Sequence, residues 1–329
     1  ASRELCHTPS LLWVDHVVPP SEQPPPPERH AMTIPTLVNA SVGRPITRLG
    51  ISLFPVYLPG NHLPKMATGP DSGLIIDELP AAQVPQLVVI NPTDIPVLVV
   101  EGEQFVGGAQ NRTANVSVLV PAGAKVEIPV SCLEQGRWGA YRDFEYGRTF
   151  SHRRVRRAKQ HSVAMSMAMA GSRSSDQGAV WGAIENEIRN MDLDAPTHAM
   201  ADADQAFERD WDRSAAAEEL CGLGPLPGQC GVVVTHGHRA VSAEVFGSPD
   251  LLAPHWNALV RSHLLERPTA GDRPSATAAL KLLGRFAEAE SVDSPGIGLG
   301  VELHVRTGRV TGQALTLDGS IVHTSLFRK

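Results

Sequence analysis

The chain has 329 residues, of which 42% are hydrophobic and 19% are charged, and its formal net charge is −6. This composition is typical of a globular protein with a sizeable core, and the negative charge argues against a surface built entirely for nucleic acid. No apolar run approaches the roughly 18–20 residues of a membrane-spanning helix, and the first residues do not resemble a signal peptide. The four cysteines lack the regular spacing of a disulfide framework. We therefore expect a cytoplasmic protein without a membrane partner.

The first residues, 1–30, are predicted to form a proline-rich N-terminal tail. Pro19-Pro20 and the run Pro24 to Pro27 favour extended polyproline geometry, and charged residues keep the segment solvated. A short apolar stretch at residues 11–14 could dock on the body of the protein or on a protein partner. A loosely packed terminal segment is the simpler interpretation.

Residues 31–329 are predicted to form a single α+β domain, which begins with a β-rich half at 31–146. Its early strands are expected at 36–41, 50–58 and 73–79. Further strands follow up to residue 132, because β-branched residues alternate there with polar ones.

The middle of the chain, 147–228, is predicted to be a helical insertion. Apolar residues recur at helical spacing from Val180 to Met191. A second helix fits residues 198–221, with Phe207 and Trp211 on its inward face and acidic residues outward.

The last part of the chain, 229–329, combines strands with further helices. Ser248 and Ser275 are expected helix caps, and Asp318-Gly319 favours a type I′ hairpin turn. Strands and helices come in blocks and do not alternate, which predicts an α+β fold. We expect an antiparallel β-sheet or β-sandwich core, with the helical insertion and the helices packed on one side.

Polar residues interrupt the apolar strands of the β-rich half at two places, and the first extends from Glu101 to Arg112. Glu101 and Glu103 could act as general acid or base, or as oxygen ligands for Mg²⁺ or Ca²⁺. Gln110 and Asn111 offer paired donors and acceptors, and Arg112 could bind a carboxylate or phosphate through two hydrogen bonds. The alternative is a polar β-corner whose side chains satisfy neighbouring backbone groups.

The second polar cluster contains Cys132, Glu134, Arg137 and Trp138. Glu134 is another candidate acid or base, and an arginine beside a tryptophan suits a planar, charged ligand such as a nucleotide. A core tryptophan, with Arg137 bound to a nearby carboxylate, explains the same residues equally well. Cys132 is a candidate nucleophile, but it continues the apolar phase of its strand, as small buried residues do.

The remaining histidines and cysteines carry weaker predictions. Cys221, Cys230, His236 and His238 match no structural zinc spacing, so no metal site is expected, and the sequence identifies no cofactor. His323, near the end of the chain, is a candidate ligand-binding residue, and a satisfied strand histidine is the alternative.

Six basic residues lie between Arg148 and Lys159. Such a run could contact a phosphate-bearing partner. No aromatic residues are interleaved with it. We therefore favour a solvated helix start that pairs with the acidic helix at 202–210 over binding to nucleic acid.

The two polar clusters together resemble a known family. The segment VEGEQFVGGAQNR, followed fifteen residues later by IPVSCLEQGRW, is similar to the ARG- and rhodanese-phosphatase-associated protein domain. This is an uncharacterised prokaryotic family, and ARG in its name stands for ADP-ribosylglycohydrolase. The likeness continues through Trp181 and the GVVV strand at Gly231 to VHTSLF, over most of residues 35–329. The family name records genomic association, so the resemblance implies a fold neighbourhood and nucleotide-derivative chemistry without a mechanism.

The leading hypothesis is a domain that binds a small nucleotide-like or ADP-ribose-like anionic ligand, with Glu103 and Glu134 available for acid/base chemistry. The residues expected to bind it are Gln110, Asn111, Arg112, Arg137, Trp138 and His323. This hypothesis requires that the two clusters line one solvent-reachable hollow. The alternative is a non-enzymatic interaction or scaffold module, in which the tail recruits a protein partner and both clusters are structural.

Overall fold

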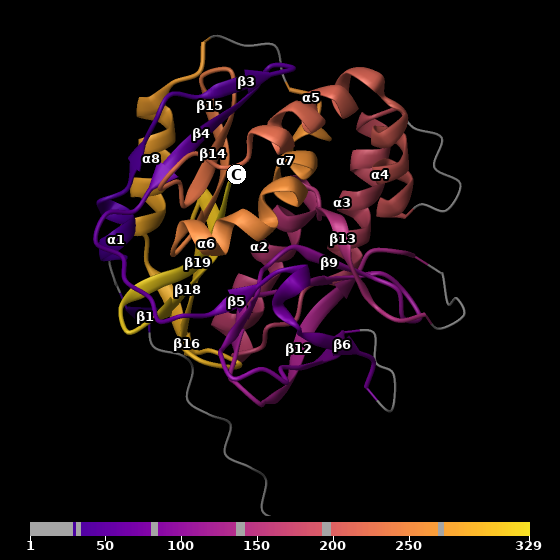
Figure 1. Ribbon diagram of the computed structural model, residues 1–329, viewed down its shortest axis with the longest axis vertical. Coiled ribbons are helices and arrows are strands. Elements are labelled where there is room, and N and C mark those ends of the chain that lie inside the picture. Colours follow the sequence, from indigo (N-terminus) through magenta and orange to yellow (C-terminus); the bar gives the residue numbers. More distant parts are fainter. Residues whose placement is uncertain (1–28, 31–33, 80–84, 136–141, 193–198, 269–272) are drawn as a thin grey trace, which may run out of the picture.

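The computed structural model describes residues 29–30, 34–79, 85–135, 142–192, 199–268 and 273–329 (Figure 1). Within these residues the strands form three β-sheets, and every strand pair except β5–β8 is antiparallel. Helices pack around the sheets, so the predicted α+β class with a sheet core is confirmed. The predicted tail lies almost entirely outside the described residues, and so does any protein contact expected of it.

The largest sheet joins strands from both ends of the chain. In spatial order it contains β1 (Arg29–His30), β16 (Ser291–Pro295), β17 (Val301–Arg306), β18 (Val310–Leu317), β19 (Ser320–Arg328), β15 (Arg239–Phe246), β14 (Gly231–His236), β4 (Ile51–Tyr57) and β2 (Ser41–Val42), and β3 (Ile46–Arg48) pairs with β4. Because β4 pairs with β14, Val56 lies opposite Gly231, 175 positions later in the chain. The predicted turn between β18 and β19 has φ of 49° at Asp318 and 79° at Gly319, as a type I′ turn requires.

The two smaller sheets come from the β-rich half of the sequence. One contains, in order, β13 (Glu145–Phe150), β9 (Glu103–Val106), β10 (Arg112–Ala114), β12 (Lys125–Cys132), β7 (Gln86–Ile90) and β6 (Ile75–Asp77). The other contains β11 (Val118–Val120), β8 (Val97–Val99) and β5 (Ala67–Thr68). A bridge between Leu119 and Leu299 links this three-stranded sheet to the last part of the chain.

The helices form two groups, one in the middle of the chain and one near its end. The first contains α2 (Arg153–Ala170), α3 (Gln177–Asn190), α4 (Met200–Arg209) and α5 (Trp211–Leu223). The second contains α6 (Pro249–Leu252), α7 (Trp256–Leu264) and α8 (Ala276–Ala287), and the 3-10 turns are η1 (Pro70–Ser72) and η2 (Ala253–His255). Both predicted caps are confirmed, because Ser248 Oγ accepts a hydrogen bond from Leu251 N at 3.3 Å and Ser275 Oγ accepts one from Ala278 N at 3.2 Å.

Helices cover both faces of the largest sheet. On β15, Ala243 and Val245 pack with the apolar side of α8, whereas Glu244 between them points to the other face and bonds to Arg156 of α2. Successive side chains of a strand point to opposite faces, so α8 and α2 lie on opposite sides of this sheet. Figure 1 shows α8 and α1 (Pro35–Val38) at one side and α3, α4 and α5 at the other.

The early strands agree with the sequence in two cases out of three. β4 and β6 lie within 50–58 and 73–79, but most of the predicted strand 36–41 is wrong, because α1 begins there. Proline at the first position of a helix has a suitable φ and lacks an N–H that would need a partner. Leu37 then buries its side chain to 1% exposure in the apolar cluster that includes α8.

The helix predicted over 198–221 is divided in two at Asp210. This residue leaves the helical region with φ −82° and ψ 103°, and its side chain caps α5 by accepting a hydrogen bond from Arg213 N at 3.2 Å. Phe207 is buried as predicted, but Trp211 is 84% exposed, so its predicted inward position is wrong. The capping aspartate changes the direction of the chain, and the helical face no longer continues across it.

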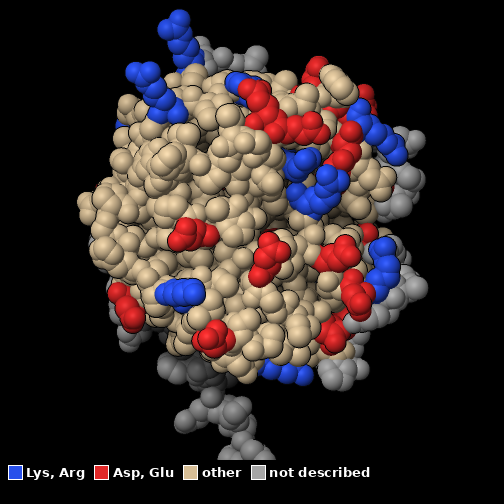
Figure 2. Space-filling view, viewed as in Figure 1, with Lys and Arg blue, Asp and Glu red and all other residues tan. Residues whose placement is uncertain are grey.

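The face of the molecule in Figure 2 carries acidic and basic side chains interspersed on a mostly uncharged surface. It shows no wide area of a single sign, in agreement with the small net charge of the chain. In the part of the chain that the structure describes, no helix combines the length and the apolar character needed to cross a membrane.

Candidate functional site

The two polar clusters of the sequence meet through the pairing of β10 with β12. Arg112 lies opposite Cys132 in this ladder, and the chain segments just beyond it remain side by side. Asn111 N donates to Glu134 Oε2 at 2.9 Å, and Asn111 Nδ2 donates to Glu134 Oε1 at 3.2 Å. Gln110 Nε2 lies 3.4 Å from the carbonyl oxygen of Glu134. The antiparallel register therefore brings together residues that are more than twenty positions apart.

Most of the converging side chains are directed into the protein. Arg112 is 1% exposed and Glu134 is 5% exposed. The Arg112 guanidinium lies 4.0 Å from Glu78 Oε1, and Glu134 is engaged with Asn111. These contacts are those of the polar β-corner that the sequence left open as an alternative. Arg137 and Trp138 lie outside the described residues, so their predicted binding roles remain predictions.

Cys132 lies in the interior of this corner. Its side chain is fully buried, and its Sγ donates to the carbonyl oxygen of Glu134 at 3.0 Å. Burial raises the pKa of the Cys132 thiol, and the nearby Arg112 charge only partly opposes this. The thiol is therefore kept protonated at neutral pH, which gives no support to its predicted role as a nucleophile.

Glu103, the other predicted acid or base, points away from Glu134. Its Oε2 accepts a hydrogen bond from Val100 N at 2.7 Å, and its Oε1 lies 3.2 Å from His255 Nδ1. His255 Nε2 lies in turn 2.7 Å from Thr68 Oγ1. Hydroxyl, imidazole and carboxylate thus form a chain, but Thr68 Oγ1 donates its proton to the Leu98 carbonyl oxygen at 2.8 Å. The imidazole therefore donates to the hydroxyl, which is the reverse of a catalytic triad. Sequence spacing gave no signal for it, because its members lie on β5, β9 and η2.

This hydroxyl–imidazole–carboxylate chain is sealed in the core. Thr68, Glu103 and His255 are each exposed by 5% or less, and the His255 ring stacks on Phe246 at a centroid distance of 5.3 Å. The cavities described below take none of their lining from these three side chains. The arrangement orders the contact between β5, β9 and η2 and offers no access to a substrate.

His323, a predicted ligand residue, belongs to a second chain of hydroxyl, imidazole and carboxylate. Ser117 Oγ accepts hydrogen bonds from Glu101 N at 3.0 Å and from Gln313 Nε2 at 2.8 Å. Its own proton therefore points to His323 Nδ1 at 2.8 Å, which leaves the imidazole proton on Nε2, 2.9 Å from Glu244 Oε1. All of these side chains are buried, so His323 lies in the core and not at a solvent-reachable surface.

Glu101 and Glu244 are joined through the first two turns of α2. Arg156 Nη2 lies 2.7 Å from a carboxylate oxygen of each glutamate, and Lys159 Nζ lies 2.8 Å from Glu101 Oε1. Burial lowers the pKa of Lys159 to about 8 in spite of the opposing charge of Glu101. Gly102 permits the approach, because a Cβ at this position would lie only 2.2 Å from Arg156 Nε. This buried ion cluster, Glu101, Arg156, Lys159 and Glu244, fastens α2 to β15 and to the turn before β9.

The residues of the basic run therefore have different partners and different degrees of burial. Arg148 pairs with Glu208 at 3.2 Å, and His152 Nε2 lies 3.6 Å from Asp204 Oδ1, so part of this segment pairs with α4 as predicted. Arg156 and Lys159 are in contrast almost completely buried, and the prediction of a solvated helix start is wrong for them. The sequence shows no signal for this, because the partner carboxylates come from distant strands.

A cavity of about 520 Å³ opens beside the converged clusters, between β9, β13 and α4. Gln104 and Asn111 line it from the side of β9, and Asp204 lines it from α4. Gln104 Nε2 donates to Thr149 Oγ1 at 2.9 Å, and Thr149 Oγ1 donates to Asp204 Oδ1 at 3.1 Å. Tyr146 and Phe207 add aromatic surface. Of the predicted site residues within the described part of the chain, Asn111 is the one that reaches this cavity.

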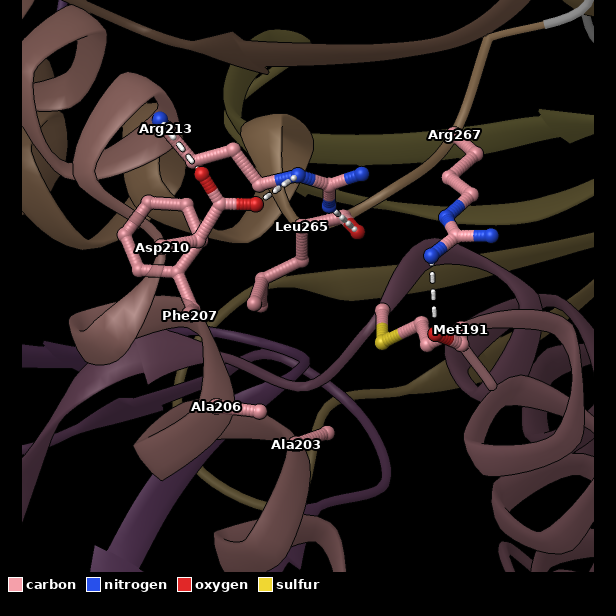
Figure 3. Close-up of a pocket in the computed structure, with 8 residues that line it drawn as sticks. All are labelled: Met191, Ala203, Ala206, Phe207, Asp210, Arg213, Leu265 and Arg267. Carbon is pink, nitrogen blue, oxygen red and sulfur yellow. Dashed lines mark hydrogen bonds and ion pairs between the residues drawn. The ribbon is translucent and has the colours of Figure 1, made fainter. Parts of the chain in front are cut away.

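A much smaller cavity of about 60 Å³ lies between α4 and the segment after α7, and Figure 3 shows its lining. Arg213 Nε lies 3.1 Å from Asp210 Oδ2, and the same guanidinium donates to the Leu265 carbonyl oxygen. Arg267 Nη2 donates to the Met191 carbonyl oxygen at 2.9 Å. The polar groups are bonded within the wall, and the space is too small for an organic ligand.

No group of three or more His, Cys, Asp or Glu side chains in the described part of the chain is arranged to hold a metal ion. The carboxylates considered as oxygen ligands, Glu101 and Glu103, bond instead to cationic and backbone partners.

Comparison with known proteins gives one match. No curated protein and no solved structure matches the chain. A family model, the ARG and Rhodanese-Phosphatase-superfamily-associated Protein domain, matches residues 39–327. The match includes both polar clusters, the four helices of the middle segment and the final strands. The chain therefore belongs to the ARG and Rhodanese-Phosphatase-superfamily-associated Protein domain family, as the resemblance in its sequence predicted.

Proposed function

We propose that the protein binds a small nucleotide-like ligand in the cavity between β9, β13 and α4. The observation that carries this proposal is the cavity itself, about 520 Å³ in volume, in which polar side chains converge between aromatic ones. Cavities of roughly 300–1,000 Å³ with a few placed polar groups are typical of small-molecule sites. The predicted clusters contribute to it through Asn111.

The lining side chains suit the nucleoside part of such a ligand. The Gln104 amide donates one proton to Thr149 and offers its carbonyl oxygen and second N–H to the edge of a base, whereas the Asn111 amide is held by Glu134 and shapes the wall. The Asp204 carboxylate can accept hydrogen bonds from sugar hydroxyls. Tyr146 and Phe207 provide apolar ring surface against which a base can pack.

The charges of the lining limit how anionic the ligand can be. Glu145, Asp204 and Glu208 face two guanidinium groups, and one of these, Arg148, already pairs with Glu208 at 3.2 Å. This balance favours a neutral nucleoside or sugar with a small anionic end near Arg209, and it disfavours a polyphosphate. Neither Glu103 nor Glu134 lines the cavity, so the proposal covers binding and includes no glutamate-based acid/base chemistry.

Isothermal titration calorimetry and thermal unfolding with adenosine, AMP and ADP-ribose test this proposal. Saturation at 100 times the Kd stabilises a protein by about 2.7 kcal/mol, which raises the melting temperature by several degrees. Ala201→Trp fills the cavity from α4 and is expected to abolish the rise. Ala215→Trp, on the exposed side of α5, is the matched control and is expected to bind normally. Binding that survives Ala201→Trp unchanged, or no binding of any of the three compounds, would refute the proposal.

A further inference from the structure

The start of α2 concentrates positive charge in a way that the proposed function does not use. Arg153, Arg154 and Arg157 are among its first five residues, and its first turn contains no acidic residue. Arg153 and Arg157 are four positions apart, so they are neighbours on the helix surface, and like charges at this spacing destabilise a helix. The cap residue His152 makes no side-chain hydrogen bond to the helix, and the positive end of the helix dipole adds to the unfavourable charge.

These three arginines line a cavity of about 250 Å³. Its walls also come from β14, β15, β19 and the segment after α7. The arginines that line it are Arg153, Arg154, Arg157, Arg239, Arg267 and Arg328. No carboxylate is part of the lining in the described part of the chain. We call this space the arginine-lined cavity.

Two glutamates behind the wall compensate only part of this charge. Arg153 forms two hydrogen bonds to Glu266, at 2.7 and 2.6 Å, and both side chains are more than nine-tenths buried. Arg154 Nη1 lies 3.0 Å from Glu187 Oε1. Six guanidinium groups thus face two carboxylates, which leaves a surplus of four positive charges. The two-fold bond to Glu266 also holds Arg153 in a fixed orientation.

The arginines affect one another in the absence of a counter-ion. Burial lowers the pKa of Arg157, and the charges of Arg153 and Arg154 lower it further. Burial and the charge of Arg239 act in the same direction on the pKa of Arg328. Positive charge is therefore held in this space at a cost in free energy, which an anion would remove.

His236 supplies a second, independent observation. Its side chain is 7% exposed and lines the cavity from the end of β14. Its Nε2 is buried without a hydrogen-bond partner, and the nearest carboxylate oxygen, on Glu266, is 3.7 Å away. Such an atom has a hydrogen bond to give, to a water or to a ligand that enters the cavity.

We propose that the arginine-lined cavity binds a small, multiply charged phosphoryl anion. Guanidinium groups match phosphate oxygens through paired hydrogen bonds, and a surplus of four charges favours an anion with several negative charges over a monocarboxylate. The cavity has about half the volume of the proposed ligand cavity, which suits phosphate, pyrophosphate or the phosphoryl end of a small molecule. The two sites share no lining residue, so each can fail without the other.

Isothermal titration calorimetry of the full chain with pyrophosphate, phosphate and AMP, at constant ionic strength, tests this inference. Pyrophosphate is expected to bind, and sulfate at the same concentration is expected to bind at least tenfold more weakly. The double variant Arg157→Gln/Arg328→Gln is expected to weaken pyrophosphate binding by roughly a hundredfold, because each lost charged hydrogen bond costs about a factor of ten. Tighter binding of AMP than of phosphate in the Ala201→Trp variant, whose other cavity is filled, would identify an esterified phosphoryl group as the ligand.

Two controls separate a built site from a general charge effect. Arg309→Gln removes an exposed arginine between β17 and β18 and is expected to leave binding unchanged. The double variant is expected to melt, without ligand, at the same or a higher temperature, so that a loss of binding is not a loss of fold. Equal binding of sulfate and pyrophosphate, or pyrophosphate binding retained in the double variant, would overturn the inference. Tighter binding of a short single-stranded RNA than of pyrophosphate would overturn it as well.

Discussion

Helix α2 presents its arginines to two environments that treat positive charge differently. Toward the sheets, Arg156 and Lys159 meet Glu101 and Glu244, so two buried cations face two buried anions. Toward the arginine-lined cavity, six guanidinium groups share two carboxylates. Charges that serve the fold find their counter-charges within the chain. An uncompensated group of like charges, in contrast, indicates a place for a counter-charge from outside the chain.

Removing an arginine from the buried ion cluster should have the largest effect on the free energy of unfolding. In Arg156→Met, Glu101 and Glu244 stay buried and lose a shared partner, and removal of one member of a buried ion pair costs about 3–5 kcal/mol. We expect a loss of this size in the free energy of unfolding, measured by urea denaturation. The double variant Arg156→Met/Glu244→Gln leaves Glu101 paired with Lys159 and removes the carboxylate that has lost its cation, so it should regain part of the stability. An Arg156→Met protein as stable as the parent would show that the ion cluster does not hold α2.

Acid should also weaken the buried ion cluster, with a smaller loss in the free energy of unfolding. Burial alone would raise the pKa of Glu101, but the charges of Arg156 and Lys159 outweigh it and lower the pKa from 4.5 to about 2. A carboxyl group with a lower pKa in the folded state stabilises the protein above its unfolded value and loses this contribution as the pH falls. The difference corresponds to roughly 3 kcal/mol, lost between about pH 4.5 and pH 2.

Urea denaturation at a series of pH values measures this dependence. Arg156 also lowers the pKa of Glu244, so the parent protein should lose stability steeply below about pH 4.5. The Glu101→Gln variant should show a shallower dependence over the same range. Identical pH profiles for the two proteins would contradict the assignment to Glu101.

Removing an arginine from the arginine-lined cavity should have the smallest effect on the free energy of unfolding, and this effect should be stabilising. Arg157→Gln removes a charge that is repelled by Arg153 and Arg154, and like charges one helical turn apart cost about 0.2–0.5 kcal/mol. In phosphate-free buffer the variant should be as stable as the parent or up to about 0.5 kcal/mol more stable. Arg189→Gln on α3 is a matched control that removes a favourable pair with Glu185 at 3.5 Å, so it should lose a little stability. Clear destabilisation by Arg157→Gln would show that the cluster is already neutralised.

The sequence predicted those features that depend on local pattern. Alternation of apolar residues located the strands, serine caps located helix starts, and the block order of elements gave the α+β class. It failed at Trp211, where a single capping aspartate redirected the chain, and at α1, where Pro35 began a helix in an apolar segment. In each case one residue with a strong local effect outweighed the periodic pattern around it.

The site was predictable only in part, for reasons of topology. The antiparallel register of β10 and β12 unites Asn111 with Glu134, but the two-cluster hypothesis also required a solvent-reachable hollow, and Glu134 is only 5% exposed. Pattern alone does not state whether such a cluster opens to solvent or closes on itself. The cavity takes Asp204 from α4, almost a hundred positions after Asn111, and no spacing rule connects them. The roles of Arg137 and Trp138 stay as predicted from the sequence.

The pairing of β4 with β14 has a consequence for biosynthesis. Phe54 and Val56 are covered in the finished protein by strands and a helix that are translated later. Val56 cannot pair until its partner Gly231, 175 positions downstream, has been synthesised. At about 5–20 residues per second, a ribosome needs roughly 9–35 seconds to supply that strand. During this interval the nascent chain exposes an apolar strand with an unpaired edge, the kind of segment that chaperones recognise and that aggregates when they are scarce.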